Sequence, residues 1–138
     1  MSAIRTVSRG TGLAIAAEAA TFLVASLIHF GIGFDSAAGP ELLIAAILGW
    51  TGAGILRGEL RYRGLPLAAT AFATVGTILG LVIIATGKQD APDLAYHSAI
   101  LVALIATLGA LLRPVSRVPL QAVREGDGVR VDQRGADL

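Results

Sequence analysis

Residues 12–33 read Gly-Leu-Ala-Ile-Ala-Ala-Glu-Ala-Ala-Thr-Phe-Leu-Val-Ala-Ser-Leu-Ile-His-Phe-Gly-Ile-Gly, an apolar run with one acidic side chain, Glu18. A helix of about 20 such residues crosses the hydrocarbon core of a bilayer. The basic residues Arg5 and Arg9 that precede the run resemble the start of a signal peptide. However, the run is longer than the apolar region of a signal peptide, which has about 7–15 residues. We therefore predict a retained first membrane span.

Three further apolar segments follow, at residues 41–56, 65–86 and 94–112. Turn-forming residues at 34–40 and polar residues at 57–64 and 87–93 separate the four spans. The sequence thus predicts an all-α protein, a four-helix transmembrane bundle over residues 1–112. Residues 113–138 change in composition, with Pro114 and Pro119 ending the helix, and we expect them to form a short polar cytoplasmic tail.

The composition agrees with a multi-pass protein of the cell membrane. Of 138 residues, 54% are hydrophobic and only 15% are charged, which is too little charge to cover a soluble globule of this size. A net charge of +1 gives no indication of nucleic-acid binding. The absence of cysteine excludes thiolate metal sites and dithiol chemistry. The partner that the composition does indicate is the lipid bilayer.

The arginines predict the orientation of the bundle, because basic residues near span ends stay in the cytoplasm. With the N-terminus inside, ten of the 11 basic residues lie on the cytoplasmic side and only Lys88 lies outside. We therefore expect both termini in the cytoplasm.

Several spans carry rows of small residues, and helices in lipid associate through such residues. The third span carries a Gly-x-x-x-Gly motif, Gly76 and Gly80, beside a stripe of threonines at 70, 74 and 77. We interpret these as ordinary helix packing, with the threonine hydroxyls bonded to their own backbone.

Glu18 is the first candidate for function, because an ionisable side chain inside a span is expensive and points to a functional site. Thr21, Ala25 and His29 share its helix face. We expect Glu18 to exchange a proton or to bind a ligand, with Thr21 beside it; the alternative is a carboxyl that only joins helices by a hydrogen bond.

His29 and His97 lie near the outer ends of the first and fourth spans, and the acidic residues expected close to them are Asp35, Glu41, Asp90 and Asp93. Two imidazoles with carboxylates could hold a divalent metal ion, and the imidazoles alone could ligate a b-type haem. An opposing pattern lies on the fourth span: if its alanines at 99, 103 and 110 face the bundle, His97 faces the lipid headgroups. Tyr96 would then point inward and offer its hydroxyl to a polar group.

Two resemblances bear on these residues. Four short spans with a glutamate in the first resemble the small multidrug resistance exporters, in which that glutamate binds a proton and a cationic drug in turn. The segments Ala17-Glu-Ala-Ala-Thr-Phe-Leu23, Ile28-His-Phe-Gly31 and Tyr96-His97 are similar to segments of uncharacterised four-span proteins of actinobacteria. The second resemblance implies that Glu18, His29 and His97 act together, and it implies no activity.

Three functions remain open from the sequence. The first is a membrane protein that binds a ligand, metal or haem through polar residues of spans one and four. The second is a proton-coupled transporter of a small molecule, centred on Glu18 and working as a homo-oligomer. The third is an accessory subunit that assembles with a partner membrane protein and performs no chemistry. The sequence contains no recognisable catalytic motif, and it does not decide whether the protein is an enzyme.

Overall fold

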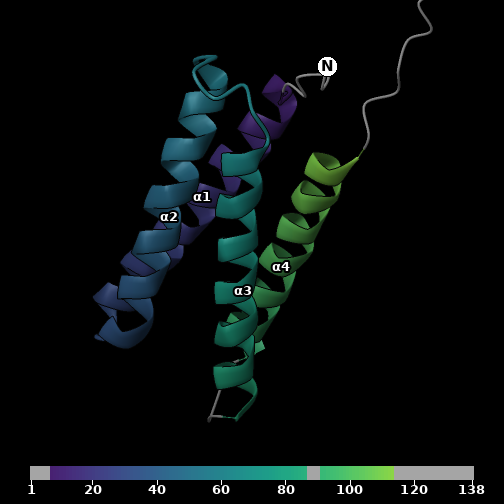
Figure 1. Cartoon of the computed structure of the whole chain (residues 1–138). Helices are drawn as coiled ribbons and strands as arrows, with labels where there is room; N and C mark the ends of the chain where they lie inside the picture. Colours follow the sequence, from purple (N-terminus) through teal and green to yellow (C-terminus); the bar gives the residue numbers. More distant parts are fainter. Residues whose placement is uncertain (1–6, 87–90, 114–138) are drawn as a thin grey trace, which may run out of the picture.

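A computed structural model describes residues 7–86 and 91–113, and the predicted tail lies outside these residues. Four helices make up the described part: α1 (Arg9–Gly31), α2 (Asp35–Leu56), α3 (Gly64–Thr86) and α4 (Ala91–Leu112). All four are long and apolar enough to cross a membrane. The predicted four-helix membrane bundle is confirmed at this level (Figure 1).

The helices run alternately up and down. The start of α1 lies beside the end of α2, where Gly12 approaches Ile55, and Arg63 before α3 reaches the end of α4. Figure 1 shows these ends together at the top. The described arginines, at 9, 57, 61, 63 and 113, therefore gather at one end of the bundle, as the orientation prediction requires.

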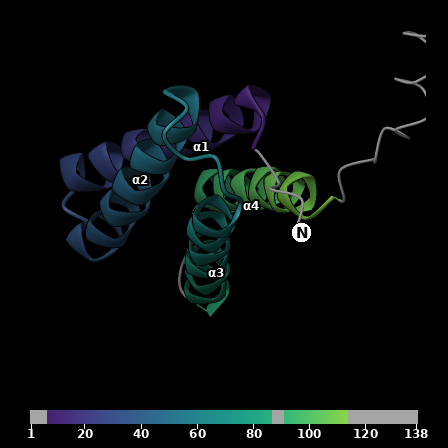
Figure 2. The ribbon, with the colours of Figure 1, turned by 45° about the horizontal axis from the view of Figure 1, so that its top comes forward.

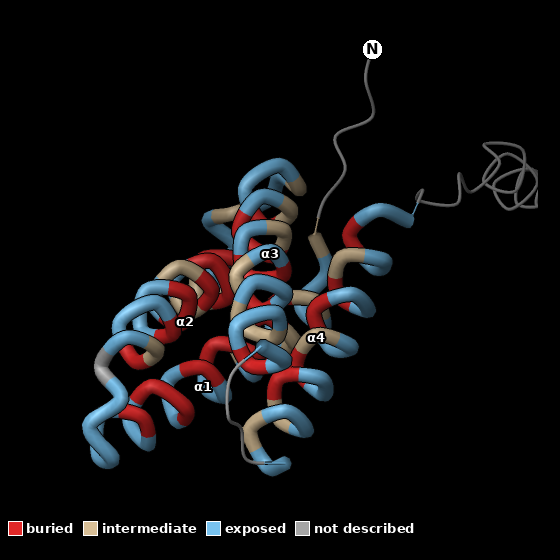
Figure 3. Tube along the Cα trace, turned by 90° about the horizontal axis from the view of Figure 1, so that it is seen from below, coloured by how far each residue is buried: buried red, intermediate tan, exposed pale blue. Residues whose placement is uncertain are grey.

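Buried residues lie on the sides of the helices that face one another, and exposed residues lie on the outer sides (Figure 3). Ile15, Phe22, Leu48 and Leu104 fill the centre. Large apolar side chains such as Val24, Val82 and Val102 point outward. A soluble protein would rarely expose so much apolar surface, so this pattern indicates helices that face lipid.

Two glycines end α1 and α2 in the same way. Gly33 and Gly58 have φ values of 76° and 77°, a conformation that other residues rarely adopt. The residue after each glycine donates its N–H to a carbonyl five residues back: Phe34 to His29 at 2.8 Å and Glu59 to Gly54 at 2.9 Å. These hydrogen bonds form Schellman caps. The cap at Gly33 reverses the chain within a few residues, so that α2 begins directly after α1.

One predicted boundary was wrong. We expected residues 34–40 to separate the first two spans, but α2 begins at Asp35 and includes Pro40 in its second turn. Residues 32–34, with Gly33 at positive φ, are enough to make the turn, and Pro40 inside α2 removes one backbone hydrogen bond. The buried Ala38 carbonyl accepts a hydrogen bond from the Ser26 hydroxyl at 2.8 Å, which joins this first part of α2 to α1.

The threonine hydroxyls of α3 form hydrogen bonds within their own helix, as predicted. Thr70, Thr74 and Thr77 are buried, and each hydroxyl donates to the carbonyl four residues earlier at 2.8–2.9 Å. These side chains therefore need no partner from another helix.

At Gly52 the backbones of α1 and α2 come close together. A Cβ atom added at Gly52 would lie 2.9 Å from the Ala16 nitrogen and 3.1 Å from the Gly12 carbonyl oxygen. These are backbone atoms that a side-chain rotation cannot move away. Small residues thus let α1 and α2 pack tightly, as helices in lipid require.

We expect Gly52→Ala to push α1 and α2 apart and to destabilise the protein by about 1–3 kcal/mol, the range for overpacked sites. Thermal unfolding in mild detergent measures this change. Gly109→Ala is the matched control, since a Cβ there meets nothing within 4 Å. Equal melting temperatures for the two variants would contradict the tight α1–α2 contact.

The orientation prediction is testable because the chain has no cysteine of its own. Ile32, in the α1–α2 turn, is 72% exposed, and the Glu59 side chain in the α2–α3 turn is 59% exposed. In intact cells we expect a membrane-impermeant maleimide to label Ile32→Cys and to spare Glu59→Cys until the membrane is opened. The reverse pattern would place both termini outside.

Candidate functional site

His29 and Glu41 meet across the α1–α2 turn. The short turn brings the last turn of α1 beside the second turn of α2. The Glu41 carboxylate accepts a hydrogen bond from His29 Nδ1 at 2.7 Å, and both residues are buried, 9% and 6% exposed. Phe34 packs edge-on against the His29 ring. Glu41 was only a weak candidate in the sequence, yet it is the closest partner of His29.

His97 joins this pair from α4. Its Nδ1 lies 3.0 Å from both the main-chain carbonyl and Oδ1 of Asp93, one helical turn earlier. Because a carbonyl only accepts, Nδ1 of His97 carries the proton in this contact. Nε2 of His97 then faces Glu41 Oε1 at 3.7 Å, and His29 Nε2 faces Asp93 Oδ1 at 3.9 Å.

These four residues alternate imidazole and carboxylate, and we call them the His–carboxylate ring. It draws on α1, α2 and α4, and Gly80 of α3 closes it, since a Cβ there would lie 3.6 Å from His97 Nε2. Oε1 of Glu41 is buried without a hydrogen-bond partner in the described structure. The convergence of the two histidines, which the sequence left open, is therefore observed in the structure.

The argument that placed His97 among the headgroups was wrong. His97 is 7% exposed and Leu104 on the same face is fully buried, whereas Ala99, Ala103 and Ala110 are exposed. The face of α4 that carries His97, Ile100 and Leu104 is thus the face packed into the bundle, and these alanines lie outside the core.

The ring is not a ready metal site. Within residues 7–86 and 91–113, no group of three or more His, Cys, Asp or Glu side chains is arranged to hold a metal ion. A haem fits still less well, because its iron needs both imidazoles on opposite faces of a wide macrocycle. Here the carboxylates of Glu41 and Asp93 occupy the space beside each Nε2.

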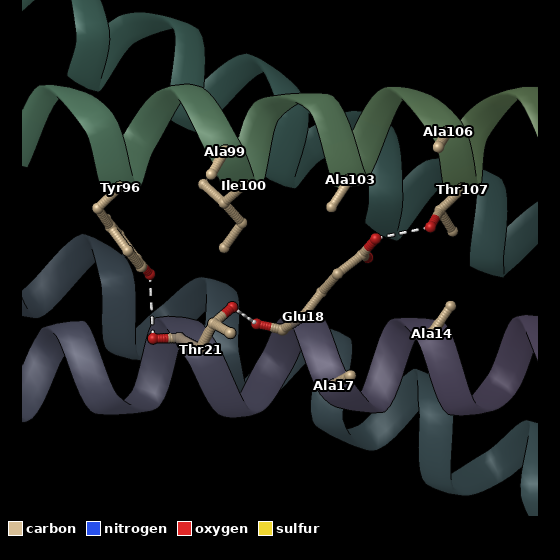
Figure 4. Close-up of a pocket in the computed structure, with 10 residues that line it drawn as sticks. All are labelled: Ala14, Ala17, Glu18, Thr21, Tyr96, Ala99, Ile100, Ala103, Ala106 and Thr107. Atoms are coloured by element: carbon tan, nitrogen blue, oxygen red, sulfur yellow. Dashed lines mark hydrogen bonds between the residues drawn. The ribbon is translucent and has the colours of Figure 1, made fainter.

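A second feature is a groove of about 520 Å³ between α1 and α4 (Figure 4). We call it the α1–α4 groove. Its wall is apolar and consists mainly of small side chains, Ala14 and Ala17 from α1 and Ala99, Ala103 and Ala106 from α4, with Ile100. Most of these alanines are exposed, so the groove opens to the surroundings of the bundle. Helix α1 lies beside both α2 and α4 (Figure 2), and its contact with α2 is the more extensive of the two.

Glu18 lies at the centre of this groove. Its side chain points from α1 towards α4, where the Thr107 hydroxyl donates to Oε1 at 2.6 Å (Figure 4). Glu18 is only 5% exposed, and Oε2 has no hydrogen-bond partner in the described structure. The ion pairs of the described residues do not include Glu18.

Thr21 and Tyr96 continue the groove beyond Glu18. The Tyr96 hydroxyl donates to the Thr21 carbonyl at 3.0 Å, and the Thr21 hydroxyl donates to the Glu18 carbonyl at 2.7 Å. Tyr96 also packs edge-on against His97, so it lies between the groove and the His–carboxylate ring. The expectation that the Tyr96 hydroxyl finds a polar partner is confirmed.

One residue of these features was missed in the sequence. Asp93 was among the acidic residues expected near the histidines, although its contact with His97, four residues later on the same helix, was not predicted. Thr107 gave no signal of its own, because its contact with Glu18 spans 89 residues and depends on how α1 and α4 are placed. Asp35 and Asp90, expected near the histidines, have no described side chains.

Comparisons with protein-family models, with curated proteins and with solved structures give no match. The resemblance to multidrug exporters, which rests on the four spans and Glu18, therefore remains a prediction, and so does the resemblance to actinobacterial four-span proteins, which rests on short segments.

Proposed function

We propose that this protein binds a small lipophilic molecule inside the membrane, in the α1–α4 groove, with the Glu18 carboxyl group as its polar contact. The observation that carries the proposal is the free oxygen Oε2 of Glu18, buried in a groove whose wall is otherwise mostly alanine. A buried polar atom without a partner is expensive and is retained where it serves a purpose.

The hydrogen-bonding groups of the groove favour one class of ligand. The hydroxyls of Thr21, Tyr96 and Thr107 all donate to atoms of the protein. The groove therefore offers acceptors, chiefly Glu18 Oε2, and the ligand has to supply a donor. An amine suits this site best, because an ammonium group both donates hydrogen bonds and balances the charge of a carboxylate.

The shape of the groove favours a ligand with an apolar body. Its volume of about 520 Å³ lies within the usual range of roughly 300–1,000 Å³ for small-molecule sites. The alanine wall leaves the space open without polar groups that would hold water. A molecule dissolved in the lipid could enter from the side and bring its amine to Glu18.

Proton-coupled transport is a second function that the position of Glu18 favours. A carboxyl group that exchanges a proton for a ligand would couple the two movements. A groove open to one side does not enclose a path across the membrane, so transport would require a second copy of the chain or a partner subunit. An accessory role would instead fill the groove with a partner helix.

Replacing the carboxyl group tests the site directly. We expect Glu18→Gln to weaken binding of a dansyl-labelled alkylamine about ten- to hundredfold, since hydrogen bonds to charged groups contribute about 1.5–3 kcal/mol. Fluorescence titration of the protein in nanodiscs measures this affinity. Glu59→Gln, at an exposed carboxyl of the α2–α3 turn, serves as the control. Unchanged affinity in Glu18→Gln would refute the proposed role of the carboxyl group.

Filling the groove tests its volume without touching Glu18. Ala103→Leu places three more carbons in the groove, and we expect loss of alkylamine binding with little change in melting temperature. Ala110→Leu is the matched control, because Ala110 is an exposed alanine of the same helix outside the groove. If both leucine variants bind like the wild type, the ligand occupies another place.

A further inference from the structure

The His–carboxylate ring has two short contacts and two long ones between imidazole nitrogens and carboxylate oxygens. The short contacts join His29 Nδ1 to Glu41 Oε2 at 2.7 Å and His97 Nδ1 to Asp93 Oδ1 at 3.0 Å. The long contacts run from His97 Nε2 to Glu41 Oε1 at 3.7 Å and from His29 Nε2 to Asp93 Oδ1 at 3.9 Å. The long contacts are not hydrogen bonds, yet they are the ones that join α4 to α2 and to α1.

Each long contact has room for one proton. When an imidazole is neutral and carries its proton on Nδ1, its Nε2 presents a lone pair. An ionised carboxylate oxygen also only accepts, so both atoms of each long contact are acceptors. Oε1 of Glu41 accordingly is buried without a hydrogen-bond partner in the described structure. A proton on Nε2 would turn each long contact into an attraction between an imidazolium and a carboxylate.

The geometry suits two imidazolium ions. An imidazolium donates from both ring nitrogens, and each nitrogen of His29 and of His97 lies within about 4 Å of a carboxylate oxygen, the range of an ion pair. Two imidazolium ions would also balance the charges of Glu41 and Asp93. With neutral imidazoles, the ring would hold two negative charges, one of them on the buried Glu41, and burial of a charge without a counter-charge is expensive.

We propose that the His–carboxylate ring is a proton-binding site, and that the bound protons tie α4 to α1 and α2 as the pH on that side of the membrane falls. An imidazole is a stronger base than a carboxylate, so the added protons reside on Nε2 of His29 and His97. The Asp93 side chain is 30% exposed, which gives water at this end of the bundle access to the ring. This inference does not depend on ligand binding in the α1–α4 groove.

The other described groups that face the ring keep their charge in the range where histidine titrates. Tyr96 packs edge-on against His97, and a phenol holds its proton at neutral pH and below. Helix α3 contributes Gly80 and contains no charged residue. Three further charged residues near this end have side chains outside the described part of the structure: Asp35, Lys88 and Asp90. Exchanges within the ring leave these three in place and therefore isolate the contribution of the ring.

The pH dependence of stability tests the proposal on the full chain, purified in mild detergent without a histidine tag. A folded protein that binds more protons than its unfolded chain becomes more stable as the pH falls. Between about pH 8 and about pH 5.5 we expect the melting temperature to rise by about 5–10 °C. At lower pH the carboxylates themselves take up protons and this gain is lost. A melting temperature that stays constant or falls over the same range would overturn the proposal.

Nuclear magnetic resonance locates the protons directly. The chain contains two histidines, and both belong to the ring, so ¹⁵N-histidine labelling reports on the ring alone. As the pH falls over the same range, we expect both Nε2 signals to move from the position of an unprotonated nitrogen to that of a protonated one. Histidines that keep a single proton each would overturn the proposal, whatever the melting temperature does.

Matched variants separate the ring from the other carboxyl groups. Glu41→Gln removes a carboxylate that faces both histidines, and we expect it to lose about half or more of the rise in melting temperature. Glu59→Gln, at the other end of the bundle, and Glu18→Gln, in the groove, should keep the rise. Asp93→Asn makes the same test if Glu41→Gln does not fold. A full rise in the folded ring variants, or its loss in Glu18→Gln alone, would place the protons elsewhere and overturn the proposal.

Discussion

A polar group inside a membrane has no water to bond with, so the chain itself must supply a partner for it. This requirement accounts for much of the local structure. The α3 threonines bond their own helix, Ser26 bonds the start of α2, and glycine caps close the ends of α1 and α2. At the arginine end, Arg63 donates to the carbonyls of Leu111 and Arg113, which end α4. The bundle is thus held by close packing and by internal hydrogen bonds together.

Helix α1 packs more tightly against α2 than against α4. Against α2, the glycines at 12 and 52 allow backbone contact, and the helices leave little space between them. Against α4, alanines face alanines across a gap that larger residues would have filled. The same property, small side chains, gives close packing on one side of α1 and a groove on the other. On the α4 side, the side chains of Glu18, Tyr96 and Thr107 reach across the gap and join the two helices by hydrogen bonds.

The sequence predicted the fold well because span length and hydropathy are set by the bilayer. It predicted the site less well. The face of α4 was misread, since alanines and leucines are both apolar and hydropathy does not distinguish a core-facing from a lipid-facing row. Glu41 stood at the predicted start of the second span, whereas α2 begins six residues earlier and places Glu41 in its second turn, beside His29. The contact between Glu18 and Thr107 depends on helix placement alone, which no local pattern encodes.

The exceptions to internal pairing are therefore the most informative atoms of the described structure. The buried polar side-chain atoms without a partner are Glu18 Oε2, Glu41 Oε1 and Arg63 Nε. Arg63 stands at the end of the bundle, where water and headgroups are near. Glu18 and Glu41 lie deeper, one in a groove and one in a ring of imidazoles and carboxylates. Both unpaired oxygens are acceptors, and a hydrogen-bond donor or a cation from outside the chain would satisfy them. Tyr96 contacts both places, through the His97 ring and through the Thr21 carbonyl.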